Sequence, residues 1–89
     1  MSLVLAKSKA GHDKGKVFVV TTSNDIDALV ADGEHRTIDH PKKKKWKHLQ
    51  VIKTLPDEVN LLAEDPLNDS LIKKILMTYQ NNHTDRKEL

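Results

Sequence analysis

AGHDKGKVFVV, residues 10–20, is the segment that decides how this chain folds. Gly11 and Gly15 bracket a charged turn, and an unbroken apolar run over residues 17–20 follows at once. Glycine tolerates positive φ and lets other groups approach the backbone closely, so the two glycines predict a tight loop. The apolar run is rich in valine and predicts a central strand with both faces covered. The segment therefore predicts a glycine-bracketed basic loop that leads into a buried strand.

Further strand candidates extend outward from this loop. One precedes it at residues 3–8, and the strand that follows it covers residues 16–22. Residues 28–31 and 35–39 predict a third and a fourth strand, joined by a tight turn at Asp32-Gly33. Pro41 ends that pattern, because proline lacks an N–H group and restricts the residue before it. A fifth strand is predicted at residues 49–52, and the set predicts an all-β domain over residues 1–53, a small SH3-like barrel.

After Thr54 the pattern becomes helical. Pro56 stands near the start of a short helix, which Asp65-Pro66 ends. Asn68 or Asp69 then caps a clearer helix over residues 70–80. Its apolar residues form one stripe, which we expect to pack on an open face of the barrel, the alternative being a helix that binds a partner or a second copy. Residues 54–89 are thus predicted to be a helical extension, with a polar, frayed C-terminus from residue 81. The stripe consists of Leu71, Ile72, Ile75, Leu76 and Tyr79.

Charge is divided unevenly between these two parts. Residues 1–53 contain 11 Lys and Arg against 6 Asp and Glu, whereas residues 54–89 contain 4 against 7. Five lysines fall within residues 42–47, in a segment that we interpret as a loop after Pro41. Such clustering indicates a polyanionic partner, because each phosphate that a lysine neutralises releases a counterion. The alternative is that both halves carry ordinary solvated surface charge.

Other function classes find little support in the sequence. The absence of cysteine excludes disulfides and Cys-based zinc sites and fits a reducing cytoplasm. We find no membrane-spanning run and no secretory signal, so a cytoplasmic location is expected. The five histidines lack the spacing of metal ligands, and neither a metal nor another cofactor is expected. No nucleophile elbow or Walker-type loop occurs, so the chain is predicted not to be an enzyme.

The glycine-bracketed loop resembles the KOW motif of ribosomal proteins and transcription elongation factors. The matching residues are Gly11, Lys14, Gly15, Lys16 and the apolar run at 17–20. Residues 29–33, Arg36 and the basic segment at 41–49 extend the likeness to small bacterial KOW-domain RNA-binding proteins, which are similar to KOW-type large-subunit ribosomal proteins. The resemblance covers roughly residues 3–52. It implies a non-catalytic protein that binds ribosomal or ribosome-associated RNA, whereas charge alone implies only a polyanion. We expect the protein to be a monomer.

The candidate RNA-binding residues lie in or beside the two basic segments. Gly11 and Gly15 are interpreted as structural. Trp46 could stack on an unpaired base or pack in the core, and the sequence leaves both open. An alternative function is a protein-interaction module that contacts a ribosomal protein or RNA polymerase. The candidates are Lys7, Lys9, His12, Lys14, Lys16, Arg36, Lys42, Lys43, Lys44, Lys45, Trp46, Lys47 and His48.

Overall fold

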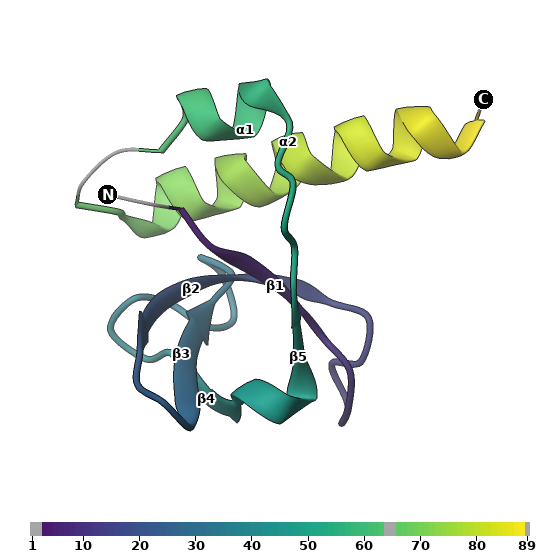
Figure 1. Cartoon of the computed structure of the whole chain (residues 1–89). Helices are drawn as coiled ribbons and strands as arrows, with labels where there is room; N and C mark the ends of the chain where they lie inside the picture. Colours follow the sequence, from purple (N-terminus) through teal and green to yellow (C-terminus); the bar gives the residue numbers. More distant parts are fainter. Residues whose placement is uncertain (1–2, 64–65, 89) are drawn as a thin grey trace.

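The computed structural model describes residues 3–63 and 66–88, with side chains described as far as Asn81. A five-stranded antiparallel sheet carries helices over one of its faces (Figure 1). The elements in chain order are β1 (Leu5–Ser8), β2 (Val17–Ser23), β3 (Asp27–Ala31), β4 (Lys42–Lys45), a 3₁₀ turn η1 (Trp46–His48), β5 (Leu49–Val51), α1 (Asp57–Leu61) and α2 (Asp69–Glu88).

The strand order across the sheet is β4-β3-β2-β1-β5. The last strand therefore returns to pair with the first, and Lys7 of β1 lies opposite both Val17 of β2 and Gln50 of β5. The sheet is strongly curled, and η1 connects its two edge strands, β4 and β5 (Figure 1). Within the described residues no ladder joins these two edges, so the sheet is not closed. The predicted β-rich N-terminal part is thus confirmed at the level of a small antiparallel sheet.

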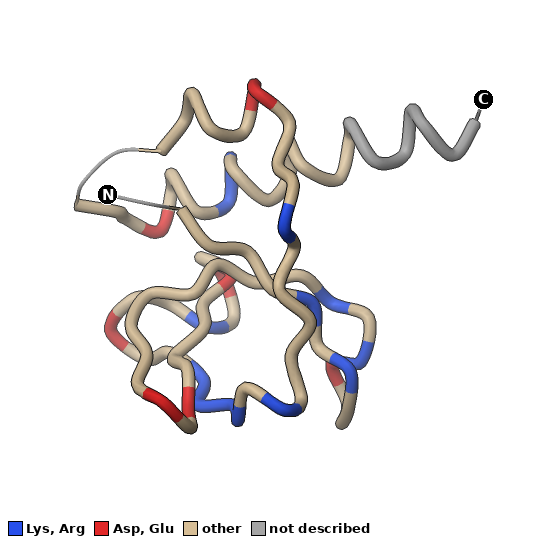
Figure 2. The backbone as a smooth tube through the Cα atoms, viewed as in Figure 1, with Lys and Arg blue, Asp and Glu red and all other residues tan. Residues whose placement is uncertain are grey.

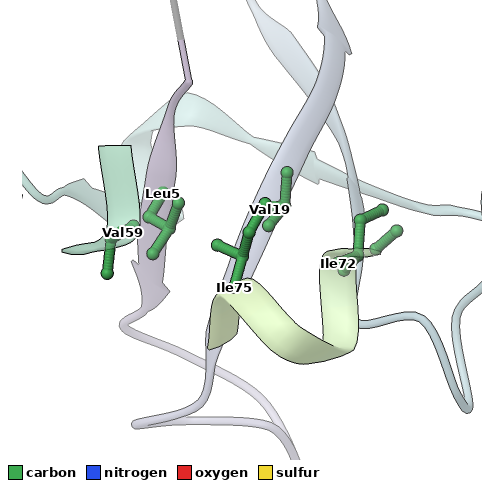
Figure 3. Packing of buried hydrophobic residues seen from close by; sticks show 6 residues of the cluster. Leu5, Val19, Val59, Ile72 and Ile75 are labelled. Atoms are coloured by element: carbon green, nitrogen blue, oxygen red, sulfur yellow. The ribbon is translucent and has the colours of Figure 1, made fainter. Parts of the chain in front are cut away.

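Two apolar clusters cover the two faces of this sheet. Neighbouring residues of a strand point to opposite faces, and the apolar run of β2 accordingly sends Phe18 into one cluster and Val19 into the other. This confirms the prediction of a central strand covered on both sides. The cluster under the helices contains Leu5, Val19, Ala31, Val59, Ile72 and Ile75 (Figure 3), and the cluster within the curl contains Ala6, Phe18, Ala28, Val30 and Leu49.

Helix α2 lies on the sheet through its apolar stripe, as predicted. Ile72 and Ile75 are fully buried in the cluster between sheet and helices. Asn68 caps the helix, because its Oδ1 accepts a hydrogen bond of 2.8 Å from the backbone N–H of Leu71. The helical backbone continues to Glu88, beyond the predicted end at residue 80, since no glycine or proline interrupts residues 81–88. Leu89 lies outside the described residues.

The region between β3 and β4 differs from the predicted hairpin. Residues 35–39 are not a strand, and the fourth strand is instead Lys42–Lys45, the segment interpreted as a loop. The cause is the buried carboxylate of Asp32, whose Oδ1 accepts backbone N–H bonds of 2.8 Å from Glu34 and from Arg36. A side chain that takes backbone donors in this way favours a local turn over a strand ladder. The other four strands lie within two residues of their predicted bounds.

Candidate nucleic-acid interface

The loop between β1 and β2 has the geometry that its glycines suggest. Gly11 and Gly15 have φ of 87° and 90°, in the left-handed region that favours glycine. Backbone hydrogen bonds of 2.8 Å from Ser8 N to Lys16 O and from Gly15 N to Ser8 O close the loop. Lys9, His12 and Lys14 project from it as exposed side chains. The loop is therefore a defined turn that presents cationic groups to solvent.

Asp13 turns inward from the same loop and anchors it to the rest of the sheet. Its carboxylate accepts hydrogen bonds from Ser8 Oγ at 2.7 Å, from Lys42 Nζ at 2.8 Å and from Lys44 Nζ at 3.0 Å. Desolvation by burial would raise the pKa of Asp13. The hydrogen bonds from Lys42, Ser8 and Lys44 outweigh this effect and hold the pKa well below its ordinary value. The anchor thus fixes the loop against β4, which is separated from β1 by two strands of the sheet.

The alternation of β4 divides its four lysines into two pairs. Lys42 and Lys44 face Asp13, and the side chain of Lys44 is only 8% exposed. Lys43 and Lys45 face the other way and are exposed, with Lys43 Nζ 3.7 Å from Asp27 Oδ2. Two of the five lysines within residues 42–47 are therefore engaged inside the protein. Lys44 in particular is a buried structural cation and is not placed to contact RNA.

Lys16 is likewise engaged within the protein. Its Nζ donates to Oδ2 of buried Asp32 and lies 5.2 Å from the ring centre of Phe18. Burial would raise the pKa of Asp32, but the hydrogen bonds from Lys16 and from the backbone of Arg36 and Glu34 lower it to about 2. The Lys16 ammonium therefore serves first as the partner of a buried carboxylate, although its side chain remains partly exposed.

Trp46 packs against the cluster within the curl. The residue is partly buried, and its indole Nε1 donates a 2.7 Å hydrogen bond to the backbone oxygen of Asn24. Of the two interpretations that the sequence leaves open, the structure thus shows the packed one. Arg36 is exposed in the loop after β3, and no described contact joins its side chain to the other candidates.

Apart from Lys7 on β1, the remaining exposed candidates lie on two segments that meet. The backbone N–H of Lys9 donates a 2.8 Å hydrogen bond to the carbonyl of His48, which joins the end of β1 to η1. Lys44 Nζ also donates to the carbonyl of Ala10, at 3.3 Å. Lys and Arg positions follow these two segments on the part of the sheet away from the helices (Figure 2). We call this the basic surface, and it comprises Lys9, His12, Lys14, Lys45, Lys47 and His48.

The residues that organise the basic surface were not among the sequence candidates. Ser8, Asp13 and Asp32 hold the loop and the lysines in place, yet none carries the charge expected of an RNA contact. One signal was available, since Asp13 is the only acid within the otherwise basic loop at residues 9–16. A lone acid in a basic loop indicates an internal ion pair, which Asp13 forms with Lys42 and Lys44, two lysines on the same face of β4.

Comparison with known protein families found no match, and comparison with curated proteins found none either. No helix in the described part of the chain is long and apolar enough to cross a membrane. Among residues 3–63 and 66–81, no three His, Asp or Glu side chains are arranged to hold a metal ion. The geometry and charge of the basic surface are therefore the features of this chain that bear on its function.

Proposed function

We propose that this chain is a non-catalytic RNA-binding protein whose curled sheet is an SH3-like barrel of the KOW kind, acting on ribosomal or ribosome-associated RNA in the cytoplasm. The observation that carries the proposal is the Lys9–His48 backbone hydrogen bond. It unites two basic segments that are almost forty residues apart in the sequence. A combined surface of this kind offers several cations to one run of phosphates.

The pairing of charges inside the fold supports this interpretation. Asp13, Asp27 and Asp32 engage Lys42, Lys43, Lys44 and Lys16. In the described structure, no ion pair occupies the lysines of the basic surface: Lys9, Lys14, Lys45 and Lys47. Cations that form no ion pair remain available to attract a polyanion. The acids thus stabilise the fold and leave the outward charge positive.

The KOW assignment has support from the loop itself. The resemblance places two glycines around a basic turn that precedes an apolar strand. Gly11 and Gly15 adopt positive φ at those positions, and β2 begins at Val17. Loops of this shape can bring backbone N–H groups and lysines close to a phosphate. We propose that phosphate contacts hold the RNA, with Lys14 on the loop and Lys47 on η1 as the principal cations.

A pair of matched double variants tests this function. Lys14→Ala with Lys47→Ala removes two charges from the basic surface, whereas Lys73→Ala with Lys74→Ala removes two exposed charges from α2. Binding to a structured ribosomal RNA fragment is measured across a salt series. We expect the first variant to weaken binding and to make the log–log salt slope shallower by about 2, since each lysine–phosphate contact contributes about one unit.

The α2 variant should retain most of the affinity and the slope of the unaltered protein. Equal losses in both variants would mean that only net charge matters and would contradict a defined surface. Absence of RNA binding at low salt would overturn the proposal and favour the protein-interaction alternative.

A further inference from the structure

A groove of about 590 Å³ lies beside the basic surface, between the β1–β5 edge of the sheet and α2. Its volume falls in the range of roughly 300–1,000 Å³ that is usual for small-ligand sites. Lys7, Val17 and Gln50 contribute from three adjacent strands, and Tyr79 and Gln80 contribute from α2. Of the residues that the sequence analysis singled out as RNA-binding or loop residues, only Lys7 and Gly15 line this groove.

The register of the strands explains why the groove is there. Lys7 lies opposite Val17 and Gln50, and residues directly opposite each other share a face of the sheet. Two positions earlier, Leu5 and Val19 are paired on the same face and are buried under Ile72 and Ile75. The face that α2 covers at Leu5 is thus left uncovered at Lys7. The next turns of the helix then form a wall beside this uncovered area.

The lining combines cationic, amide and apolar groups. Lys7 and Lys53 are exposed and contribute the charge, and Gln50 and Gln80 contribute amide donors and acceptors. Val51, 41% exposed, adds apolar surface, as does the ring of Tyr79. None of the described lining residues is acidic. This chemistry suits a ligand that has a flat apolar body with polar edges and a negative charge at one end.

The groove is also continuous with the basic surface. Gly15 lines the groove, while its neighbour Lys14 is exposed on the loop. Lys7 of the groove is followed two residues later by Lys9, whose N–H bonds to His48 of the basic surface. A nucleic-acid backbone held on Lys9 and Lys14 would pass directly beside the opening.

We propose that the groove receives one unpaired nucleotide of the bound RNA, with its phosphate at Lys7 and Lys53 and its base between Tyr79 and the exposed strand edge. This inference rests on the proposed RNA-binding function and adds a preference for RNA with an unpaired base. Proteins recognise such bases by stacking and by hydrogen bonds to base edges, and the aromatic and amide groups of the groove provide both.

Two hairpin RNAs that differ only in a single unpaired nucleotide test the proposal. We expect the unaltered protein to bind the bulged hairpin about tenfold more tightly than the fully paired one. Gln80→Trp fills the groove from α2 and should abolish this preference while leaving binding to the paired hairpin unchanged. Asn81→Trp places the same side chain at the next exposed helical position, outside the lining, and should leave the preference intact.

Backbone amide chemical shifts of the full chain provide a second readout. The bulged hairpin should shift Gly15, Gln50 and Val51, whereas the paired hairpin should shift only the basic surface. Equal affinity for the two hairpins would overturn the groove proposal while the RNA-binding function stands. Shifts at the groove with free uridine monophosphate, but not with the bulged hairpin, would also overturn it, by assigning the groove to a free nucleotide. Failure to bind either hairpin would instead refute the proposed function.

Discussion

A single acid, Asp13, gives the basic loop its fixed position. Its carboxylate is 2.7–3.0 Å from Ser8 Oγ and from the ammonium groups of Lys42 and Lys44. Burying a lysine is costly unless an acid and further hydrogen bonds compensate the charge. Asp13 and the Ala10 carbonyl provide that compensation for Lys44. The same contacts explain why a lysine can occupy a buried strand position that the sequence pattern assigns to solvent.

Asp13→Ala should destabilise the protein by about 2–4 kcal/mol, because it leaves the buried Lys44 cation without its acid. Urea unfolding followed by circular dichroism measures the change. Asp39→Ala removes an exposed acid and should cost less than about 0.5 kcal/mol. Combining Asp13→Ala with Lys44→Met removes the unpaired charge and should recover part of the loss. If Asp13→Ala leaves the free energy of unfolding unchanged, the ion pair contributes no stability.

Among the elements, β4 is the one whose predicted position was wrong, since it was expected at residues 35–39 and lies at Lys42–Lys45. Lysine is depleted in strands, so four consecutive lysines after a proline predict a loop. The segment nevertheless pairs with β3, with Lys42 opposite Val30 and Lys45 opposite Asp27. Lysines on an edge strand also discourage edge-to-edge association with other chains. Tertiary pairing and the distant Asp13 decide this element, and neither is visible in a local window of sequence.

The loop after β3 and the start of α2 are joined by a close contact at Gly33. Ile38 N donates a 2.9 Å hydrogen bond to Asp69 Oδ1, and a Cβ on Gly33 would lie 2.4 Å from the Asp69 carbonyl oxygen. Gly33→Ala should therefore combine positive-φ strain with a backbone clash and cost about 2–4 kcal/mol. Gly15→Ala is the matched control. Its φ is also positive but nothing lies within 4 Å, so it should cost only about 1–2 kcal/mol.

Urea unfolding of the two glycine variants separates strain from contact. The difference between their free energies of unfolding measures the cost of the clash between a Cβ at residue 33 and the start of α2. If Gly15→Ala and Gly33→Ala lose the same stability, the contact between this loop and the helix is not tight in solution.

For the whole molecule, the two-sided apolar run of β2 was the most informative part of the sequence. A strand that is apolar at successive positions requires cover on both faces, and the apolar stripe of α2 supplies the cover on one of them. The apolar run of β2 predicted the covered central strand, and the stripe at residues 71–79 predicted the helix that packs on it. The groove beside α2 could not be foreseen in this way. It depends on where the helix crosses the sheet, and Lys7, Gln50, Lys53 and Gln80 form no motif in sequence.

The two internal carboxylates predict how the stability of the whole fold depends on pH. Asp13 and Asp32 both have a folded-state pKa below the ordinary value of 3.8, and that of Asp32 is about 2. A depressed folded-state pKa contributes stability that is fully present above the unfolded value and is lost as pH falls through the folded one. The contribution of these two groups to the free energy of unfolding should therefore be constant from neutral pH to about pH 5. It should fall between about pH 4 and pH 2.

Asp32 alone should contribute about 2 kcal/mol to that fall. Urea unfolding at a series of pH values measures it, with Asp13→Asn and Asp32→Asn as the variants that lack the titrating groups. Each variant should be less stable than the unaltered protein at pH 7 and should lose less stability on acidification, because the lysine partner is already unpaired. If the plots of unfolding free energy against pH remain parallel down to pH 2 for the variants and the unaltered protein, other groups cause the acid sensitivity of the fold. The ion pairs of Asp13 and Asp32 would then not be coupled to folding.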